Sequence, residues 1–167
     1  STVAGAAVND WLCIPFQRVG PITPASTDVD LIRFFGADNV VRRTIYVAEG
    51  TEQRDVSVIY PDTANELTVF WRDNRYGSAP QLVRFRRGDT AWKTVFGITV
   101  GTSLEEANRI NGRPFTISGF GWDYGGLPRW EGGSLAIKGL GLRFEPQPGV
   151  SLAYYGDGKR VRSDDPV

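Results

Sequence analysis

The residue types best suited to binding chemistry lie in one glycine-rich segment, residues 119–133. Large aromatic side chains are interspersed there with glycines, which leave the backbone open to close approach. Such rings can stack on sugars or anchor a protein partner, and charged neighbours can add hydrogen bonds at the rim. The alternative interpretation is a bulged hairpin whose aromatic side chains fill the core of its own sheet. The candidate binding residues are Phe120, Trp122, Asp123, Tyr124, Arg129, Trp130 and Glu131.

Catalytic chemistry is restricted by the residue types that the chain lacks. It contains no histidine, which excludes Ser-His-Asp and Cys-His catalysis and any zinc site with a histidine ligand. The one cysteine, Cys13, excludes a four-cysteine zinc site and an intrachain disulfide. The sequence has no P-loop, no calcium loop and no G-x-S-x-G nucleophile elbow. We therefore expect a non-enzymatic protein that uses no metal and no cofactor.

Carboxylates are the remaining candidates for catalysis. Glu49, Glu52 and Asp55 surround one expected turn, and Asp123 and Glu131 flank the aromatic segment. A glycosidase needs two carboxylates that face each other across a cleft. We interpret these five as solvated turn residues and keep carbohydrate hydrolysis as the alternative.

The overall charge argues against nucleic acid or an anionic membrane as a partner. The 167 residues include 19 basic and 19 acidic side chains, so the formal net charge is zero. No apolar run approaches the roughly 20 residues that span a bilayer. We expect no nucleic-acid partner and no membrane span, and a partner that is either an unknown protein or a glycan.

The N-terminal residues suggest an exported protein. The chain has no methionine and starts with Ser1 followed by small residues, as after removal of a leader. We therefore expect a periplasmic or secreted location. Cys13 lies in the apolar run Trp11-Leu-Cys-Ile and is expected to be a small buried hydrophobic residue rather than a nucleophile.

Two short helices are predicted from capping signals. Ser26 or Thr27 can cap the first, with acidic residues in its first turn and Gly36 at its end. The second is expected to begin at Thr102, in a capping box with Glu105, and to stop at Gly112.

The rest of the chain has the period of two that is typical of strands. Turn residues separate the apolar runs, and such short links favour antiparallel neighbours. The tail from residue 156 to 167 is polar and is expected to be frayed. A short strand is expected before Phe16, and the further predicted strands are 40–48, 55–60, 67–72, 81–86, 92–96, 115–120, 134–138, 140–144 and 151–155.

The fold class predicted from these elements is α+β, with short helices packed on antiparallel sheet. We expect a single domain, 1–167. The helix-opening segments 22–36 and 98–112 share identical residues at four aligned positions, which suggests tandem helix-plus-sheet repeats at about 20–96 and 97–155.

Short runs of residues in two parts of the chain resemble known protein families. GTSLEEANRINGRPF at residues 101–115 resembles the helix-opening motif of SmpA/OmlA-type envelope lipoproteins and of the β-lactamase inhibitor protein. The runs FGADNV, YPDT, VFWRD and GFGWDYGG, within residues 19–146, resemble a family of bacterial secreted proteins without assigned function. The first resemblance implies short helical segments on an antiparallel sheet, and neither supplies catalytic residues.

The function we expect is therefore binding. A non-enzymatic envelope or secreted module would engage a protein partner through a sheet face and the 122–130 loop. This hypothesis predicts a contiguous exposed aromatic patch. The alternative is a carbohydrate-binding or carboxylate-only carbohydrate-active protein, which predicts a concave cleft with aromatic residues on its floor.

Overall fold

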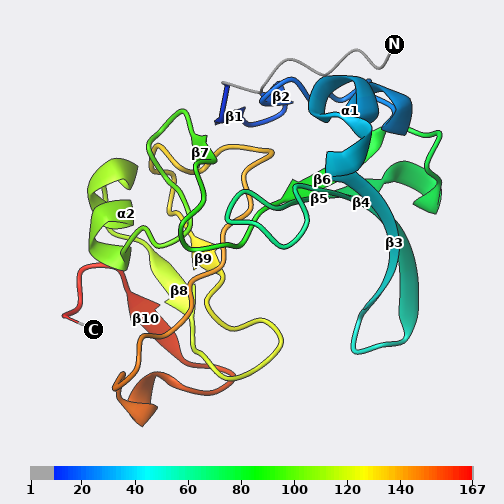
Figure 1. Cartoon of the computed structure of the whole chain (residues 1–167). Helices are drawn as coiled ribbons and strands as arrows, with labels where there is room; N and C mark the ends of the chain where they lie inside the picture. The colour runs from blue at the N-terminus through cyan, green and yellow to red at the C-terminus, as the bar shows by residue number, and fades with distance from the viewer. Residues whose placement is uncertain (1–9, 167) are drawn as a thin grey trace. The chain divides into compact units, whose positions relative to one another are not determined.

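The computed structural model describes residues 10–166 of the chain. Within them the fold is α+β, with two short helices and three sheets of mostly antiparallel strands, as the sequence predicted (Figure 1). Internal contacts divide the chain into two compact units, Ser1–Gly101 and Thr102–Val167, called unit 1 and unit 2 below. The single domain and the tandem repeat stay predictions.

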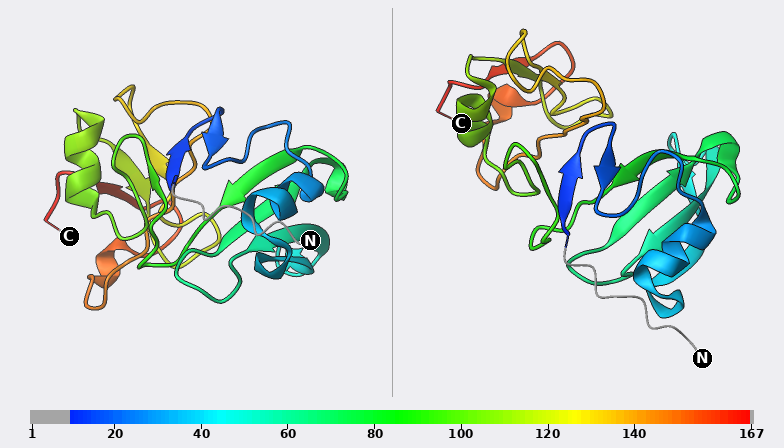
Figure 2. Two further views of the ribbon diagram at one scale, coloured as in Figure 1. Left: turned by 45° about the horizontal axis from the view of Figure 1, so that its top comes forward. Right: turned by 90° about the horizontal axis from the view of Figure 1, so that it is seen from above.

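Unit 1 is built on a four-stranded antiparallel sheet in the order β3-β4-β5-β6. Its strands match four predicted apolar runs, and each link is a short turn segment, which is why sequential strands are neighbours. The two views of Figure 2 show helix α1 against this sheet. The strands are β3 (Val40–Val47), β4 (Glu52–Ile59), β5 (Leu67–Trp71) and β6 (Pro80–Arg84).

Helix α1 (Asp28–Phe35) begins at the predicted cap. The Thr27 side chain accepts from the Asp30 backbone N–H, and the Asp30 carboxylate accepts from the Thr27 N–H, which completes a capping box. The same Thr27 N–H holds the pKa of Asp30 below its usual range. The helix ends at Gly36, whose φ of 87° suits glycine.

One face of the sheet and α1 enclose the main core of unit 1. Trp71 is fully buried, and its indole N–H donates to the Ser57 hydroxyl at 2.9 Å. Trp92 is also fully buried and donates to the Asn65 carbonyl at 2.9 Å. The other buried members are Ile22, Leu31, Phe35, Ile59, Leu67 and Val69.

The opposite face of the sheet carries a smaller apolar cluster. Buried Val56, Val58 and Phe70 pack there with Val41, Ile45 and Val47. The Arg84 guanidinium lies 4.9 Å from the centre of the Phe70 ring, a cation–π arrangement. The two faces alternate residue by residue, as half-buried antiparallel strands require.

A second small sheet in unit 1 has the order β2-β1-β7. It comprises β1 (Leu12–Ile14), β2 (Arg18–Val19) and β7 (Lys93–Thr94), and β1 pairs with β7 in parallel. The strand expected before Phe16 is therefore confirmed as β1, and the strand expected at 92–96 is shorter than predicted. The 3-10 helix η1 (Ala37–Asn39) connects α1 to β3, and the 3-10 helix η2 (Arg72–Asn74) follows β5 on the way to β6.

Cys13, in β1, is buried as expected. Burial raises the pKa of its thiol from 9.0 to about 12, and the positive charge of Arg18 opposes part of this rise. Because the folded state keeps the proton that the unfolded chain releases, this contribution to stability is complete below pH 9 and is lost towards pH 12. The stability advantage of the wild type over Cys13→Ala, measured by urea unfolding, should therefore shrink across this range. A stability difference between the two proteins that stays constant from pH 8 to 11 would contradict this prediction.

Unit 2 opens with helix α2 (Leu104–Asn111). Its cap is Ser103, whose hydroxyl accepts from the Glu106 N–H at 3.0 Å, so the predicted cap at Thr102 is wrong by one residue. Both Thr102 with Glu105 and Ser103 with Glu106 satisfy the capping-box pattern, and the pattern alone does not choose between them. Gly112 ends the helix at φ 75°, as predicted.

The sheet of unit 2 has the order β10-β8-β9. It comprises β8 (Thr116–Ser118), β9 (Pro128–Arg129) and β10 (Arg160–Arg162). The tail predicted to be frayed therefore contains β10, because Val161 pairs with Ile117 and is fully buried.

Three predicted strands in unit 2 are wrong. Residues 134–138 and 140–144 form no strand, and 151–155 contains the 3-10 helix η3 (Leu152–Tyr154). The physical reason is that these backbones bond to isolated distant groups instead of a neighbouring strand. Leu135 N donates to the Asn111 side chain, and Phe144 N donates to the Gly126 carbonyl.

Candidate functional site

The candidate site is built on the loop 119–126, which follows β8. Its backbone is bound at both ends to other parts of unit 2: Gly119 N donates to the Lys159 carbonyl, and Phe120 N donates to the Tyr154 carbonyl, both at 2.9 Å. At its far end, Gly126 N donates to the Ser118 carbonyl at 2.9 Å. Backbone hydrogen bonds therefore hold both ends of the loop to the rest of unit 2.

Arg143 holds the middle of this loop. Its guanidinium donates to three loop carbonyls, those of Gly125 at 2.9 Å, Trp122 at 3.1 Å and Asp123 at 2.8 Å. Because these guanidinium N–H groups point at backbone oxygens, this arginine stabilises the conformation of the loop. Charge-assisted hydrogen bonds of this kind are among the stronger ones in proteins.

Side chains of the loop and of β8 complete the hydrogen bonding. The Trp122 indole N–H donates to the Gly119 carbonyl at 2.8 Å, and the Ser118 hydroxyl donates to the Tyr124 carbonyl. The Gly125 N–H donates to the Trp122 carbonyl at 3.0 Å. These bonds fix the backbone on each side of Tyr124.

The loop leaves two aromatic rings accessible. Tyr124 is 63% exposed, and its ring lies 5.4 Å from that of half-buried Trp122, edge to face. Edge-to-face packing restricts both rings and stabilises the pair. The accessible aromatic surface of the loop 119–126 is therefore this pair.

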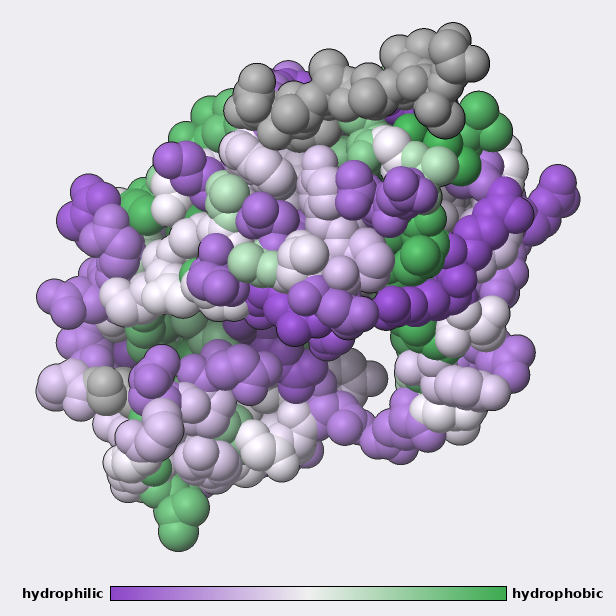
Figure 3. All heavy atoms as spheres, viewed as in Figure 1, coloured by the Kyte–Doolittle hydropathy of each residue, from purple (hydrophilic) through white to green (hydrophobic). Residues whose placement is uncertain are grey.

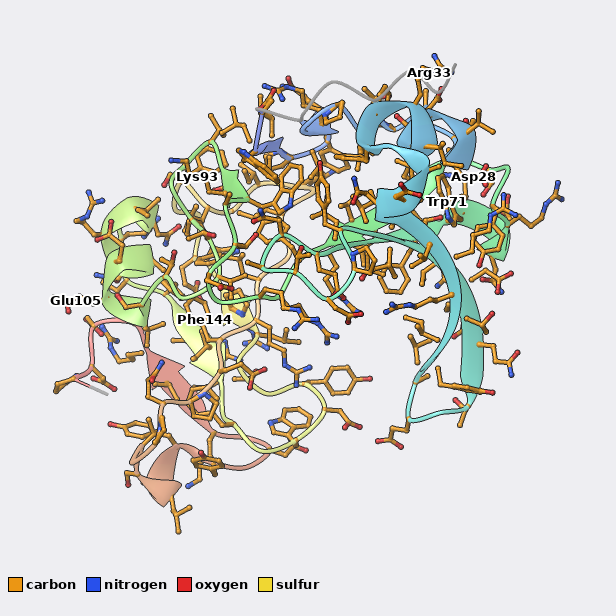
Figure 4. The ribbon with its side chains drawn as sticks, viewed as in Figure 1. Asp28, Arg33, Trp71, Lys93, Glu105 and Phe144 are labelled. Atoms are coloured by element: carbon orange, nitrogen blue, oxygen red, sulfur yellow. The ribbon has the colours of Figure 1, made fainter. Side chains whose placement is uncertain are left out.

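The other two predicted aromatic residues pack against aromatic rings outside the loop. Phe120 is buried, with its ring 5.9 Å from that of Tyr155. Trp130 is half-buried, 4.6 Å from the ring of buried Phe115 and 6.5 Å from that of Phe144, which Figure 4 labels. The fully exposed aromatic patch from Phe120 to Trp130 expected from the sequence is therefore not present, because Phe120 is buried and Trp130 packs against Phe115.

The charged candidates lie at the surface. Asp123 is exposed within the loop, and Arg129 is exposed on β9, where it pairs with Thr116. Glu131 is exposed just after β9, with a left-handed φ of 54°. Of the three, only Asp123 belongs to the loop that carries Trp122 and Tyr124.

A pocket of ≈ 330 Å³ lies beside the loop in unit 2. Aromatic rings and glycines form part of its lining, and the second half comes from residues 143–146, which are not among the candidate residues predicted from the sequence. That segment has the alternation of a strand and no motif, so no sequence signal identified it. The lining residues are Phe120, Gly121, Trp122, Gly125, Arg143, Phe144, Glu145 and Pro146.

The carboxylates singled out in the sequence do not converge on this pocket. Glu52 and Asp55 lie on β4 in unit 1, where Asp55 accepts from the Thr44 hydroxyl at 2.9 Å. Glu145 is the carboxylate in the lining. Within residues 10–166, no group of three or more His, Cys, Asp or Glu side chains is arranged to hold a metal ion.

Asn111 connects the end of α2 to the segment that follows β9. It is 2% exposed, and its side-chain amide donates to the carbonyls of Arg113 at 2.9 Å and Trp130 at 3.0 Å. Its side-chain oxygen accepts from the Leu135 N–H at 3.0 Å. One buried amide thus holds three backbone groups that lack a partner strand.

Comparison with models of protein families, with curated proteins and with solved structures finds no match to this chain. The resemblances noted in the sequence therefore stay predictions, and a function has to be argued from the loop and its pocket. No helix among the described residues is long and apolar enough to cross a membrane.

Proposed function

We propose that this protein is a non-enzymatic binding module of the bacterial envelope or of the secreted fraction, and that it engages a protein partner. The proposed contact surface is the loop 119–126. The observation that carries the proposal is an exposed tyrosine ring on a loop whose backbone is already hydrogen-bonded within its own unit.

A loop held in this way has little conformational freedom left to lose on binding. Ordering of flexible loops and side chains is a main cost of association, and a preformed loop avoids much of it. Tyrosine adds a large contact area with only two side-chain torsions to fix. The Arg143 contacts with Trp122 and Asp123 therefore support Tyr124 as an interface anchor.

The pocket supplies a second contact beside the exposed ring. Its volume of ≈ 330 Å³ is at the small end of the range for ligand sites. It suits one side chain of a partner, packed against Trp122 and Phe144, with Glu145 as a hydrogen-bond acceptor. Aromatic residues next to such a pocket are typical of interface hot spots.

Carbohydrate binding is the second candidate function. Aromatic walls beside a carboxylate suit a sugar ring, which stacks through its C–H face and donates its hydroxyls. Hydrolysis needs two facing carboxylates, and the lining formed by described residues contributes Glu145 alone. This supports binding over hydrolysis for a sugar ligand.

The proposal is tested by selecting peptides from a displayed random library against the whole chain. Selected peptides should lose about 10-fold or more in affinity towards Trp122→Ala and Tyr124→Ala, as expected for hot-spot aromatics. The matched control is Phe16→Ala in unit 1, since Phe16 is 68% exposed and Tyr124 63%. Monovalent peptides should bind this control as they bind the wild type.

A glycan array with the same variants separates the two candidates. Saturable sugar binding that Trp122→Ala abolishes would favour the carbohydrate-binding alternative. Peptides or sugars that bind all three variants with unchanged affinity would show that the loop is not the binding site.

A further inference from the structure

Strand β3 forms an uninterrupted edge of the four-stranded sheet. It pairs with β4 through eight consecutive residue pairs, from Val40 with Ile59 to Val47 with Glu52, without a bulge. Among the described residues, no strand pairs with its other side. Figure 3 shows both hydrophilic and apolar residues along this hairpin, which extends from the sheet in Figure 1.

The register shows which backbone groups point outward. Tyr60 N donates to the Asn39 carbonyl at 2.8 Å, so 39 and 60 form a hydrogen-bonded pair one step beyond the strand end. Hydrogen-bonded and non-hydrogen-bonded pairs alternate in an antiparallel ladder. The odd-numbered residues of β3 therefore bond to β4. The N–H and C=O groups of Arg42, Thr44 and Tyr46 face away from it.

The opposite edge of the sheet has features that hinder pairing with another strand, whereas β3 has none of them. Strand β6 starts with Pro80, which has no N–H, and its register with β5 shifts between Phe70 and Trp71. Proline and bulges are the usual means by which edge strands avoid pairing with another chain. Strand β3 has neither.

The two arginines of β3 do not hinder such pairing either, because their charges are paired with carboxylates of unit 1. Arg42 is ion-paired with Asp28 and lies 4.4 Å from the centre of the Tyr76 ring. Arg43 lies 3.8 Å from the Asp62 carboxylate. The whole chain has a net charge of zero, so two copies do not repel each other at long range.

We propose that two copies of this chain associate through β3, antiparallel, with Thr44 on the two-fold axis, to form a continuous eight-stranded sheet. Only pairings between residues with outward-facing backbone groups can bond, and the register centred on Thr44 meets this condition. It places Arg42 opposite the partner's Tyr46. It places Val41 opposite the partner's Val47, which extends the apolar cluster of that face.

The positions of the arginines in β3 favour an antiparallel second copy over an in-register parallel one. A parallel pair would set Arg42 and Arg43 beside the same residues of the partner subunit, and like charges directly opposite are destabilising. The antiparallel register separates the two Arg42 side chains by about four residues along the strand. A two-fold interface of this kind is self-complementary, as most homodimer interfaces are.

The first test measures the mass of the whole chain by sedimentation equilibrium over a concentration series. A reversible dimer is expected for the wild type and for Thr44→Ser. Thr44→Pro should raise the dimer dissociation constant by about 10-fold or more, because it removes both hydrogen bonds of the central pair. It leaves the β3–β4 ladder intact, since the Thr44 N–H does not take part in it, and far-UV circular dichroism checks this.

The second test reads the register by disulfide formation. Hydrogen-bonded antiparallel pairs have Cα atoms about 5.5 Å apart, within disulfide range. Thr44→Cys should therefore form a disulfide-linked dimer under mild oxidation. Tyr46→Cys should not, since two copies of residue 46 are roughly 14 Å apart in this register. Buried Cys13, with its thiol pKa at about 12, does not compete.

Three results would overturn the inference. They are a chain that stays monomeric at every concentration, a dimer that Thr44→Pro leaves intact, and cross-linking of Tyr46→Cys as fast as Thr44→Cys. Each is independent of the peptide and glycan experiments, which address the loop in unit 2.

Discussion

Gly126→Ala is expected to destabilise unit 2 by about 3 kcal/mol, through overpacking and backbone strain together. Gly126 has a φ of +74°, and a Cβ there would overlap the Phe144 carbonyl group. The collision is with backbone, so a side-chain rotation cannot relieve it. It would also break the bonds that Gly126 makes to Ser118 and Phe144, which join β8 to the segment lining the pocket.

The matched control is Gly141→Ala in the same unit. A Cβ at Gly141 meets no atom within 4 Å, and no left-handed φ is required there. Its effect should stay within about 0.5 kcal/mol, as for surface changes in general. Urea unfolding followed by aromatic circular dichroism measures both, and equal stabilities of the two variants would show that the Gly126 contact is not needed.

Trp92→Ala is expected to destabilise unit 1 by about 3–5 kcal/mol, the usual result of truncating a fully buried tryptophan. The indole is 0% exposed, and its ring lies 4.8 Å from that of Trp11. Its removal also leaves the Asn65 carbonyl without its indole donor. Trp92→Phe is the graded control, since it keeps most of the volume and loses the hydrogen bond. It should lower the free energy of unfolding by less than Trp92→Ala does.

Hydrogen exchange of the backbone amides localises both effects. Trp92→Ala should speed exchange in β4 and β5, whereas Gly126→Ala should speed it in α2 and β8. This separation is expected because each unit has its own buried residues. If one substitution speeds exchange equally in both units, the chain unfolds as the single cooperative domain that the sequence suggested.

The fold of unit 1 was largely predictable because its elements are long and locally consistent. The strands of the large sheet are five to eight residues long and each contains valine among other apolar residues, and the links between strands are rich in turn residues. Helix α1 has a cap, acidic residues in its first turn and a terminal glycine, all within ten residues. Pattern and tertiary structure agree there.

Unit 2 was less predictable because distant single groups organise its backbone. Residues 134–144 alternate in polarity like a strand, yet they bond to Asn111 and Gly126. Conversely, β10 is a strand only because Val161 has Ile117 to pair with, and its neighbours are arginines. The local period of apolar and polar residues indicates neither the distant partners of residues 134–144 nor the pairing of Val161 with Ile117.

The candidate site was predicted in part. The aromatic segment 119–133 was selected for its composition, and it does contain the exposed Tyr124. Composition could not separate the packed rings of Phe120 and Trp130 from the accessible ones, since glycines interrupt any strand period there. Arg143, which fixes the loop, lies outside the segment, and only the folded chain brings it to the Trp122 carbonyl.

The buried amide of Asn111 has a consequence for the chemical ageing of the protein. Asn111 precedes Gly112, and asparagine followed by glycine deamidates readily when the glycine nitrogen can attack the side-chain carbonyl. In the folded chain the Gly112 N–H donates to the carbonyls of Asn108 and Arg109, and the Asn111 amide is held by two backbone oxygens. Conversion to aspartate would replace that donating amide by a carboxylate facing the same carbonyls. Deamidation at Asn111 should therefore proceed only in molecules whose unit 2 has opened, and its rate in stored protein records how often that happens.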